Sequence, residues 1–103
     1  MARFAEVIEA LKNGGSAYRE LWGSNKNIVK QIPQCIKSDI VPKMTSLPDV
    51  AKRKVGKMGS GEIAYHNQVL EIAYWNDINM PAYATYYIPT WEDIFAEDWV
   101  IVY

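Results

Sequence analysis

The apolar positions near the start of the chain recur every three or four residues, as they do along one side of a helix. They are Phe4, Val7, Ile8 and Leu11, and the charged Glu6 and Glu9 lie between them. Two glycines follow at Gly14 and Gly15, and glycine readily adopts the left-handed conformation that ends a helix. The pattern predicts a helix over residues 3–12.

Further along the chain the apolar residues are mostly β-branched or aromatic, which indicates strands. The predicted strands cover residues 16–22, 28–36, 63–65, 68–75, 82–88 and 99–103, with a turn at 23–27. Pro33 lies inside the second strand and favours an edge position or a bulge there. Residues 38–61 carry two prolines and three glycines, and predict a long loop with one short helix or strand near residues 50–55.

The last fifth of the chain predicts a short helix followed by a strand. Pro89 ends the preceding extended run, because its ring disfavours helix in Ile88. The Thr90 hydroxyl is placed to cap a helix at the amide of Asp93, which stands where a capping-box acid reaches back. The whole pattern predicts a single α+β domain over residues 1–103. Its N-terminal helix packs on an antiparallel sheet of about five strands, and a short helix precedes the last strand.

Composition favours a homo-oligomer. The chain has only 103 residues, of which 50% are hydrophobic and 13% aromatic, and a chain this short leaves much apolar surface in water unless it assembles. The formal charge of −1 provides no field to attract DNA or RNA. No apolar run approaches the ~20 residues that span a bilayer, and the N-terminus has no signal core, so no membrane partner is expected. The one cysteine, Cys35, fits a reducing cytosol.

The sequence lacks the usual parts of a catalytic or metal site. It has one histidine, His66, and one cysteine, and no Gly-x-Ser-x-Gly, His-Glu-x-x-His or Cys-x-x-Cys motif. The expectation is a protein with no catalytic residue, no metal and no cofactor. The glycine-rich run at residues 56–61 and the basic cluster at residues 52–54 fit a hairpin tip and a solvated face better than a phosphate site.

Aromatic residues give the strongest indication of binding. Four Trp and seven Tyr exceed the needs of so small a core. Trp99 belongs to the predicted core, whereas Trp22, Trp75 and Trp91 stand at boundaries between regular elements and turns, where side chains line pockets. Such rings stack on nucleobases, and they serve a protein interface equally well.

The sequence leaves two possible roles open for each of two charged residues. Arg19 either offers its planar fork to phosphate or forms a salt bridge with Glu20 or Asp98. Asp98 either accepts hydrogen bonds from the backbone amides of a neighbouring turn or accepts them from a ligand's ribose or base.

The C-terminal run Pro-Thr-Trp-x-Asp-Ile-Phe-Ala-x-Asp-Trp, residues 89–99, resembles the signature of the Thoeris anti-defence two family. A helix at residues 4–12, Gly15 and the Arg19-x-x-Trp22 pair resemble the start of that family. The resemblance covers the two ends of the chain and leaves residues 36–62 without a counterpart.

The resemblance implies a phage protein that sequesters a cyclic ADP-ribose-type (gcADPR) signal, with some members binding cyclic di- or trinucleotides. It implies a homo-oligomer, a tetramer with pockets between protomers, which does not cleave its ligand and acts in the cytoplasm of the infected bacterial host. On this interpretation the ligand-binding residues are three stacking tryptophans, three hydrogen-bonding residues for ribose or base edges, and two cations for phosphate. They are Trp22, Trp75 and Trp91, then Asn76, Asp77 and Asp98, then Arg19 and Lys26. A protein-binding inhibitor of a host defence enzyme and a nucleotide hydrolase are the alternative functions.

Overall fold

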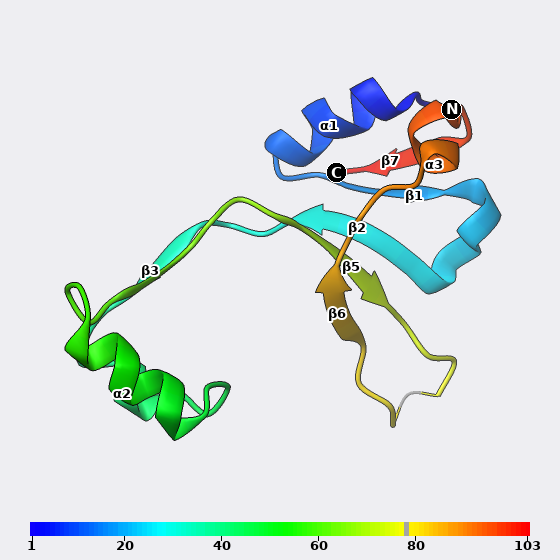
Figure 1. Ribbon diagram of the computed structural model, residues 1–103. Coiled ribbons are helices and arrows are strands. Elements are labelled where there is room, and N and C mark those ends of the chain that lie inside the picture. The colour runs from blue at the N-terminus through cyan, green and yellow to red at the C-terminus, as the bar shows by residue number, and fades with distance from the viewer. Residues whose placement is uncertain (78) are drawn as a thin grey trace. The chain divides into compact units, whose positions relative to one another are not determined.

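The computed structural model describes residues 1–77 and 79–103, which form two compact units (Figure 1). The first unit contains residues 1–31 and 68–103, and the second contains residues 32–67. The predicted α+β class is confirmed, with an N-terminal helix, a five-stranded antiparallel sheet and a short helix before the last strand. The organisation as one domain stays a prediction.

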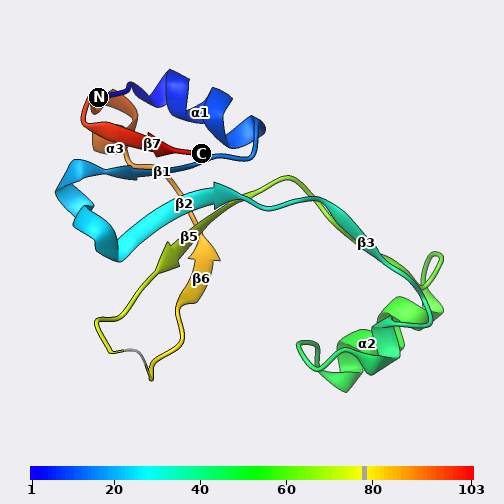
Figure 2. The same cartoon turned by 180° about the vertical axis from the view of Figure 1, so that it is seen from behind.

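The first unit is built on a sheet with strand order β6-β5-β2-β1-β7, in which all neighbours are antiparallel. Its elements in chain order are α1 (Phe4–Lys12), β1 (Ser16–Arg19), a 3-10 segment (Glu20–Asn25), β2 (Lys26–Lys30), β5 (Val69–Ala73), β6 (Tyr83–Tyr86), α3 (Trp91–Phe95) and β7 (Trp99–Val102). Because β1 and β7 pair along their whole length, the N-terminal and C-terminal parts of the chain are neighbours in the sheet (Figures 1 and 2).

The core of this unit lies between α1 and one side of the sheet. Helix α1 packs on β1, β2 and β7 and contributes the buried Val7 and Leu11 (Figure 2). Ala17 and Ile28 meet it from the strands, and Trp99 is fully buried beneath it, as the sequence predicted. We call this side of the sheet the helix side and the opposite one the open side.

Helix α3 begins where the sequence predicted, and for the predicted reason. The Thr90 hydroxyl accepts a hydrogen bond from the Asp93 amide at 3.1 Å, and the Asp93 carboxylate reaches back to the Thr90 amide at 3.5 Å. Asp93 thereby fills the position that glutamate or glutamine usually holds in a capping box. The Asp93 carbonyl also accepts a hydrogen bond from the Trp99 indole at 2.9 Å, which ties the short helix to the last strand.

The second unit contains a two-stranded ribbon and a helix. Strand β3 (Gln34–Ile36) pairs antiparallel with β4 (Ile63–Tyr65), and α2 (Asp49–Lys57) follows a 3-10 turn at Val41–Lys43. The Lys52 ammonium donates a hydrogen bond to the Pro42 carbonyl at 3.2 Å, which holds α2 against that turn. Of the short helix or strand predicted near residues 50–55, the structure has a helix, and α2 is longer than expected.

Two predicted strands differ most from the structure, whereas those predicted at 68–75, 82–88 and 99–103 are only shorter at their ends, by one or two residues. The first ends at Arg19 rather than Trp22, because the chain turns into the 3-10 segment, where Gly23 has a φ of 66°. The second begins at Lys26, earlier than predicted, and is interrupted before Gln34. Its two halves belong to different sheets, since Pro33 lacks the amide that a continuous ladder requires.

A candidate ligand site on the helix side of the sheet

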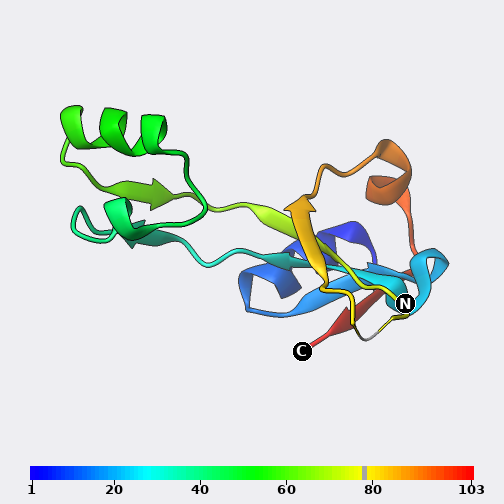
Figure 3. The same cartoon turned by 90° about the horizontal axis from the view of Figure 1, so that it is seen from below.

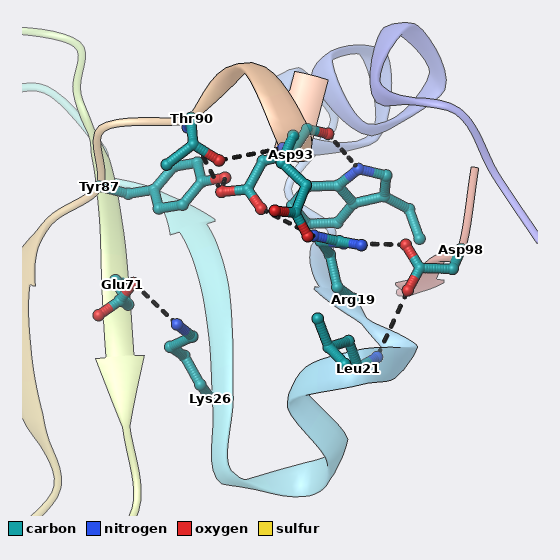
Figure 4. Close-up of polar contacts among 10 residues, drawn as sticks. Arg19, Leu21, Lys26, Glu71, Tyr87, Thr90, Asp93 and Asp98 are labelled. Carbon is teal, nitrogen blue, oxygen red and sulfur yellow. Dashed lines mark hydrogen bonds and ion pairs between the residues drawn. The ribbon is translucent and has the colours of Figure 1, made fainter. Parts of the chain in front are cut away.

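Arg19 is a nearly buried cation surrounded by three carboxylates. Its side chain is only 10% exposed. Its Nε lies 2.9 Å from Asp98 Oδ1, and its Nη1 lies 3.1 Å from Asp93 Oδ1 and 3.4 Å from Glu92 Oε1 (Figure 4). A buried charge is tolerated only when it is paired and hydrogen-bonded, and these contacts meet that requirement. The cluster joins the end of β1 to α3 and to the start of β7.

The pKa values of these groups follow from the same contacts. The hydrogen bond from Arg19 lowers the pKa of Asp98, and the Leu21 amide adds a second bond at 3.4 Å. Burial acts to raise the pKa of Asp93, but hydrogen bonds from the Tyr87 hydroxyl at 2.7 Å and from Arg19 outweigh it, so the net pKa is lowered. Burial, and then the bond to Asp93, raise the pKa of Tyr87. At neutral pH Asp93 and Asp98 are therefore ionised and the Tyr87 phenol is neutral.

These contacts concern the two roles that the sequence left open for Arg19 and for Asp98. For Arg19 the structure has the salt bridge to Asp98, and for Asp98 it has the backbone amide of a neighbouring turn, at Leu21. Two of the Arg19 nitrogens are engaged by carboxylates, so a ligand phosphate would compete with three negative groups for this cation. Direct contact of either residue with a ligand stays a prediction.

Lys26 and Trp22 form a second pair, at the start of β2. The Lys26 ammonium lies 4.2 Å from the centre of the Trp22 ring, a cation–π contact. It also lies 3.5 Å from Glu71 Oε1 (Figure 4). The Lys26 side chain remains 31% exposed. Trp22 itself is half-buried, with its ring edge-on to Trp99 at 5.1 Å and to Tyr87 at 6.1 Å. The core thus fixes Trp22, and Trp22 in turn fixes the cation.

The segment Trp75-Asn76-Asp77 lies in the connection between β5 and β6. Trp75 is 53% exposed, and its ring lies 6.0 Å from that of Tyr83. Tyr83 pairs with Ala73, two positions from Glu71, so it shares the helix side of the sheet with Lys26 and Glu71. Asn76 is exposed, and Asp77 accepts a hydrogen bond from the Asn79 amide at 2.9 Å, which shapes the turn.

Trp91 lies elsewhere, on α3. It is 72% exposed and stacks on Phe95, with ring centres 5.7 Å apart and an interplanar angle of 25°. Phe95 is 74% exposed, so the pair presents a bare aromatic surface. The predicted residues therefore occupy four places: the Arg19–Asp98 cluster, the Trp22–Lys26 pair, the 75–77 connection and α3.

We call the stretch from Trp22 and Lys26 through Glu71 to Tyr83 and Trp75 the aromatic–cation row. It runs along the helix side of the sheet across β2, β5 and β6, and all of β6 is exposed. Figure 3 shows the ribbons of these neighbouring strands from below. The sequence analysis missed Glu71 and Tyr83. A signal for Glu71 was present, since it is the one charged residue of β5 and stands between Leu70 and Ile72.

Among the described residues, no group of three or more His, Cys, Asp and Glu side chains is arranged to hold a metal ion. Within the same part of the chain, no helix has the length and apolar character needed to cross a membrane.

Comparison with known protein families assigns the chain to one of them. A family model described as Tad2-like, the Thoeris anti-defense 2-like domain, matches residues 2–102. The chain belongs to this family. The match confirms the resemblance drawn from the two ends of the sequence, and it extends through residues 36–62, where the resemblance had no counterpart. A comparison with curated proteins finds no significant match. The Tad2-like assignment gives the protein a role in countering Thoeris defence.

Proposed function

We propose that this Tad2-like domain is a sponge that binds a cyclic ADP-ribose-type (gcADPR) signal, with cyclic oligonucleotides as further ligands, and holds it without cleaving it. It acts as a homo-oligomer, a tetramer, in the cytoplasm of the infected bacterial host. Membership of a Thoeris anti-defence family supports the choice of signal, and the aromatic–cation row supports the choice of site.

The observation that carries the proposal is the placement of Lys26. Its ammonium is held on Trp22 by the 4.2 Å cation–π contact, yet it is still partly exposed on the helix side of the sheet. A bound diphosphate needs a local cation of this kind, because the protein as a whole has a formal charge of −1. The phosphate would take the place of Glu71 beside Lys26, exchanging one anion for another.

The rest of the row suits the other parts of such a ligand. The exposed rings of Trp75 and Tyr83 offer faces on which an adenine can stack, and stacking contributes about 1–3 kcal/mol per base. Asn76 and Asp77 follow Trp75 directly and carry donors and acceptors for ribose hydroxyls. Trp91 offers a second stacking surface on α3.

In this proposal Arg19 and Asp98 are positioning residues. They join β1 to β7 beside the 3-10 segment that carries Trp22, and Asp98 also accepts the hydrogen bond from the Leu21 amide. The network thereby holds the backbone on which the Trp22–Lys26 pair stands.

One surface favours the alternative of a protein-binding inhibitor. The stacked Trp91 and Phe95 on α3 are both more than 70% exposed, at 72% and 74%, and exposed aromatic residues are typical of protein interfaces. This alternative predicts a tight complex with a host defence enzyme and no affinity for a small nucleotide.

A retention experiment separates the functions. The protein is incubated with cyclic ADP-ribose isomers and, separately, with cyclic dinucleotides; free ligand is removed, the protein is heat-denatured, and the supernatant is analysed. Release of the intact nucleotide is the expected result. Release of an altered nucleotide would show an enzyme, and the absence of any retained nucleotide would favour the protein-binding alternative.

A further inference from the structure

The two units of the chain carry opposite formal charges. Residues 32–67 contain six Lys and Arg against three Asp and Glu, a charge of +3, whereas the rest of the chain has five against nine, a charge of −4. Two of the three acids in the second unit are already paired. Glu62 lies 3.5 Å from the Lys37 ammonium. Asp49 lies 3.8 Å from that of Lys52. An excess of positive charge therefore remains in this unit, and most of it is on helix α2.

Helix α2 has an inner and an outer face. Ala51, Lys52 and Val55 are partly buried, and the hydrogen bond from Lys52 to the Pro42 carbonyl holds this inner face against the 3-10 turn. The outer face consists of exposed residues spaced three or four apart, which lie on one side of a helix. They are Val50, Arg53, Lys54 and Lys57, and the exposed Met58 follows them directly. We call these five residues the basic face.

The basic face contains three cations and no acid. Arg53, Lys54 and Lys57 form no ion pair with any residue in the described part of the chain. The five side chains line a shallow hollow of about 330 Å³. Val50 and Met58 are exposed at 68% and 64%. Cations in the last turn stabilise the helix dipole, which accounts for the two lysines but not for Arg53 or for the exposed apolar side chains.

We propose that the basic face binds an acidic segment of a partner protein, one that carries an apolar residue among its carboxylates. The carboxylates would pair with the three cations, and Arg53 can hold one of them with two parallel hydrogen bonds. The apolar residue would enter the hollow beside Val50 and Met58, and methionine adapts readily to different partner side chains. A nine-residue helix is about 13 Å long, so about four extended residues of the partner would cover it.

Nucleic acids and membranes fit the basic face less well than an acidic protein segment does. Three cations neutralise about three phosphates, whereas proteins that bind duplex DNA tightly contact about 6–10. Residues 32–67 are all described, and their one aromatic residue, Tyr65, is half-buried, so this unit offers no exposed ring for base stacking. A helix that lies on a membrane carries bulky apolar residues along one whole side, and the outer face of α2 has only Val50 there.

The test uses the full protein and a defined probe, a fluorescein-labelled peptide that repeats Asp-Glu-Leu-Glu. Fluorescence anisotropy follows binding at low and at physiological salt. The variant combines Arg53→Gln with Lys57→Gln. The matched control combines Lys12→Gln with Lys43→Gln, which removes the same charge from exposed positions outside the basic face. None of these four residues belongs to the proposed nucleotide site, so failure of one proposal leaves the other standing.

The expected result is saturable binding that is roughly tenfold weaker in the variant and changes less than about twofold in the control at physiological salt, where distant charges are screened. Met58→Ser, or Ser in place of Leu in the peptide, should weaken binding several-fold at both salt concentrations, since each removes an apolar contact and no charge. Three results would overturn the inference: no binding to wild type, equal losses in variant and control, or tighter binding of a single-stranded RNA or an anionic vesicle.

Nuclear magnetic resonance gives a second measurement that needs no variant, should one of them fail to fold. Adding the unlabelled peptide to isotope-labelled wild-type protein should shift the amide signals of residues 49–58 most. Shifts confined to residues 1–31 and 68–103 would place the peptide on the other unit and overturn the inference.

Discussion

Removing the Arg19 cation tests whether the carboxylate cluster holds the fold. In Arg19→Met a chain of similar length replaces the guanidinium, which leaves Asp93 and Asp98 without their cation. Breaking a buried ion pair by removing one partner costs about 3–5 kcal/mol. We expect the lower end, about 3 kcal/mol, since Asp93 keeps its bonds to Tyr87 and Thr90 and the Asp98 side chain is 28% exposed. Native proteins have a free energy of unfolding of only about 5–15 kcal/mol, so a reduction of about 3 kcal/mol is large.

The assay is urea unfolding followed by tryptophan fluorescence, with wild type and variants at one protein concentration because assembly adds to apparent stability. A loss of about 3 kcal/mol lowers the urea midpoint by roughly 1–3 M, since the free energy of unfolding falls by about 1–3 kcal/mol per molar urea in a small domain. Arg3→Met is the matched control: Arg3 lies 3.9 Å from Glu97, both side chains are 76% exposed, and such pairs contribute about 0–1 kcal/mol. Equal losses in the two variants would refute the reasoning.

Three further predictions concern the cap, pH and the ligand. Thr90→Ala should lower the free energy of unfolding by about 1 kcal/mol, since it removes the hydroxyl that caps α3; an unchanged urea midpoint would count against the cap. Because the pKa values of Asp93 and Asp98 are lowered by folding, their contribution to stability is present above the unfolded value of about 3.9 and is lost as the pH falls through the folded values. Acid unfolding should therefore begin below about pH 4 in wild type, and a wild type whose stability is constant from neutrality to below that pH would contradict this. Lys26→Met should weaken retention of cyclic ADP-ribose isomers roughly tenfold, whereas Lys30→Met, on the same side of the same strand, should leave it unchanged; equal effects would remove Lys26 from the site.

Local signals predicted the elements of the fold that local chemistry controls. Thr90 and Asp93 form the predicted cap, and the apolar spacing of residues 4–11 forms the predicted helix. The predicted bounds of strands were wrong where tertiary structure determines where a strand ends. Residues 20–22 read as strand by composition, but Gly23 turns the chain into a 3-10 segment, and the strand predicted across Pro33 divides between two sheets.

The candidate site was less predictable because its contacts are long-range. The sequence left Arg19 open between phosphate and a salt bridge, and its partner Asp98 lies 79 positions away. Likewise, the sequence did not indicate that Lys26 would be held between Trp22 and Glu71, since only the pairing of β2 with β5 brings those residues together. Residue type was enough to identify candidate site residues, but which of them are in contact depends on the register of the strands.

Native mass spectrometry of the protein mixed with cyclic ADP-ribose isomers tests the sponge most directly. One spectrum reports both the assembly and the mass of whatever it retains. The account predicts a multiple of 11.8 kDa that carries intact nucleotide and, on activation, releases that nucleotide with its mass unchanged. Bare protein at every ligand concentration, or a nucleotide released with an altered mass, would contradict it.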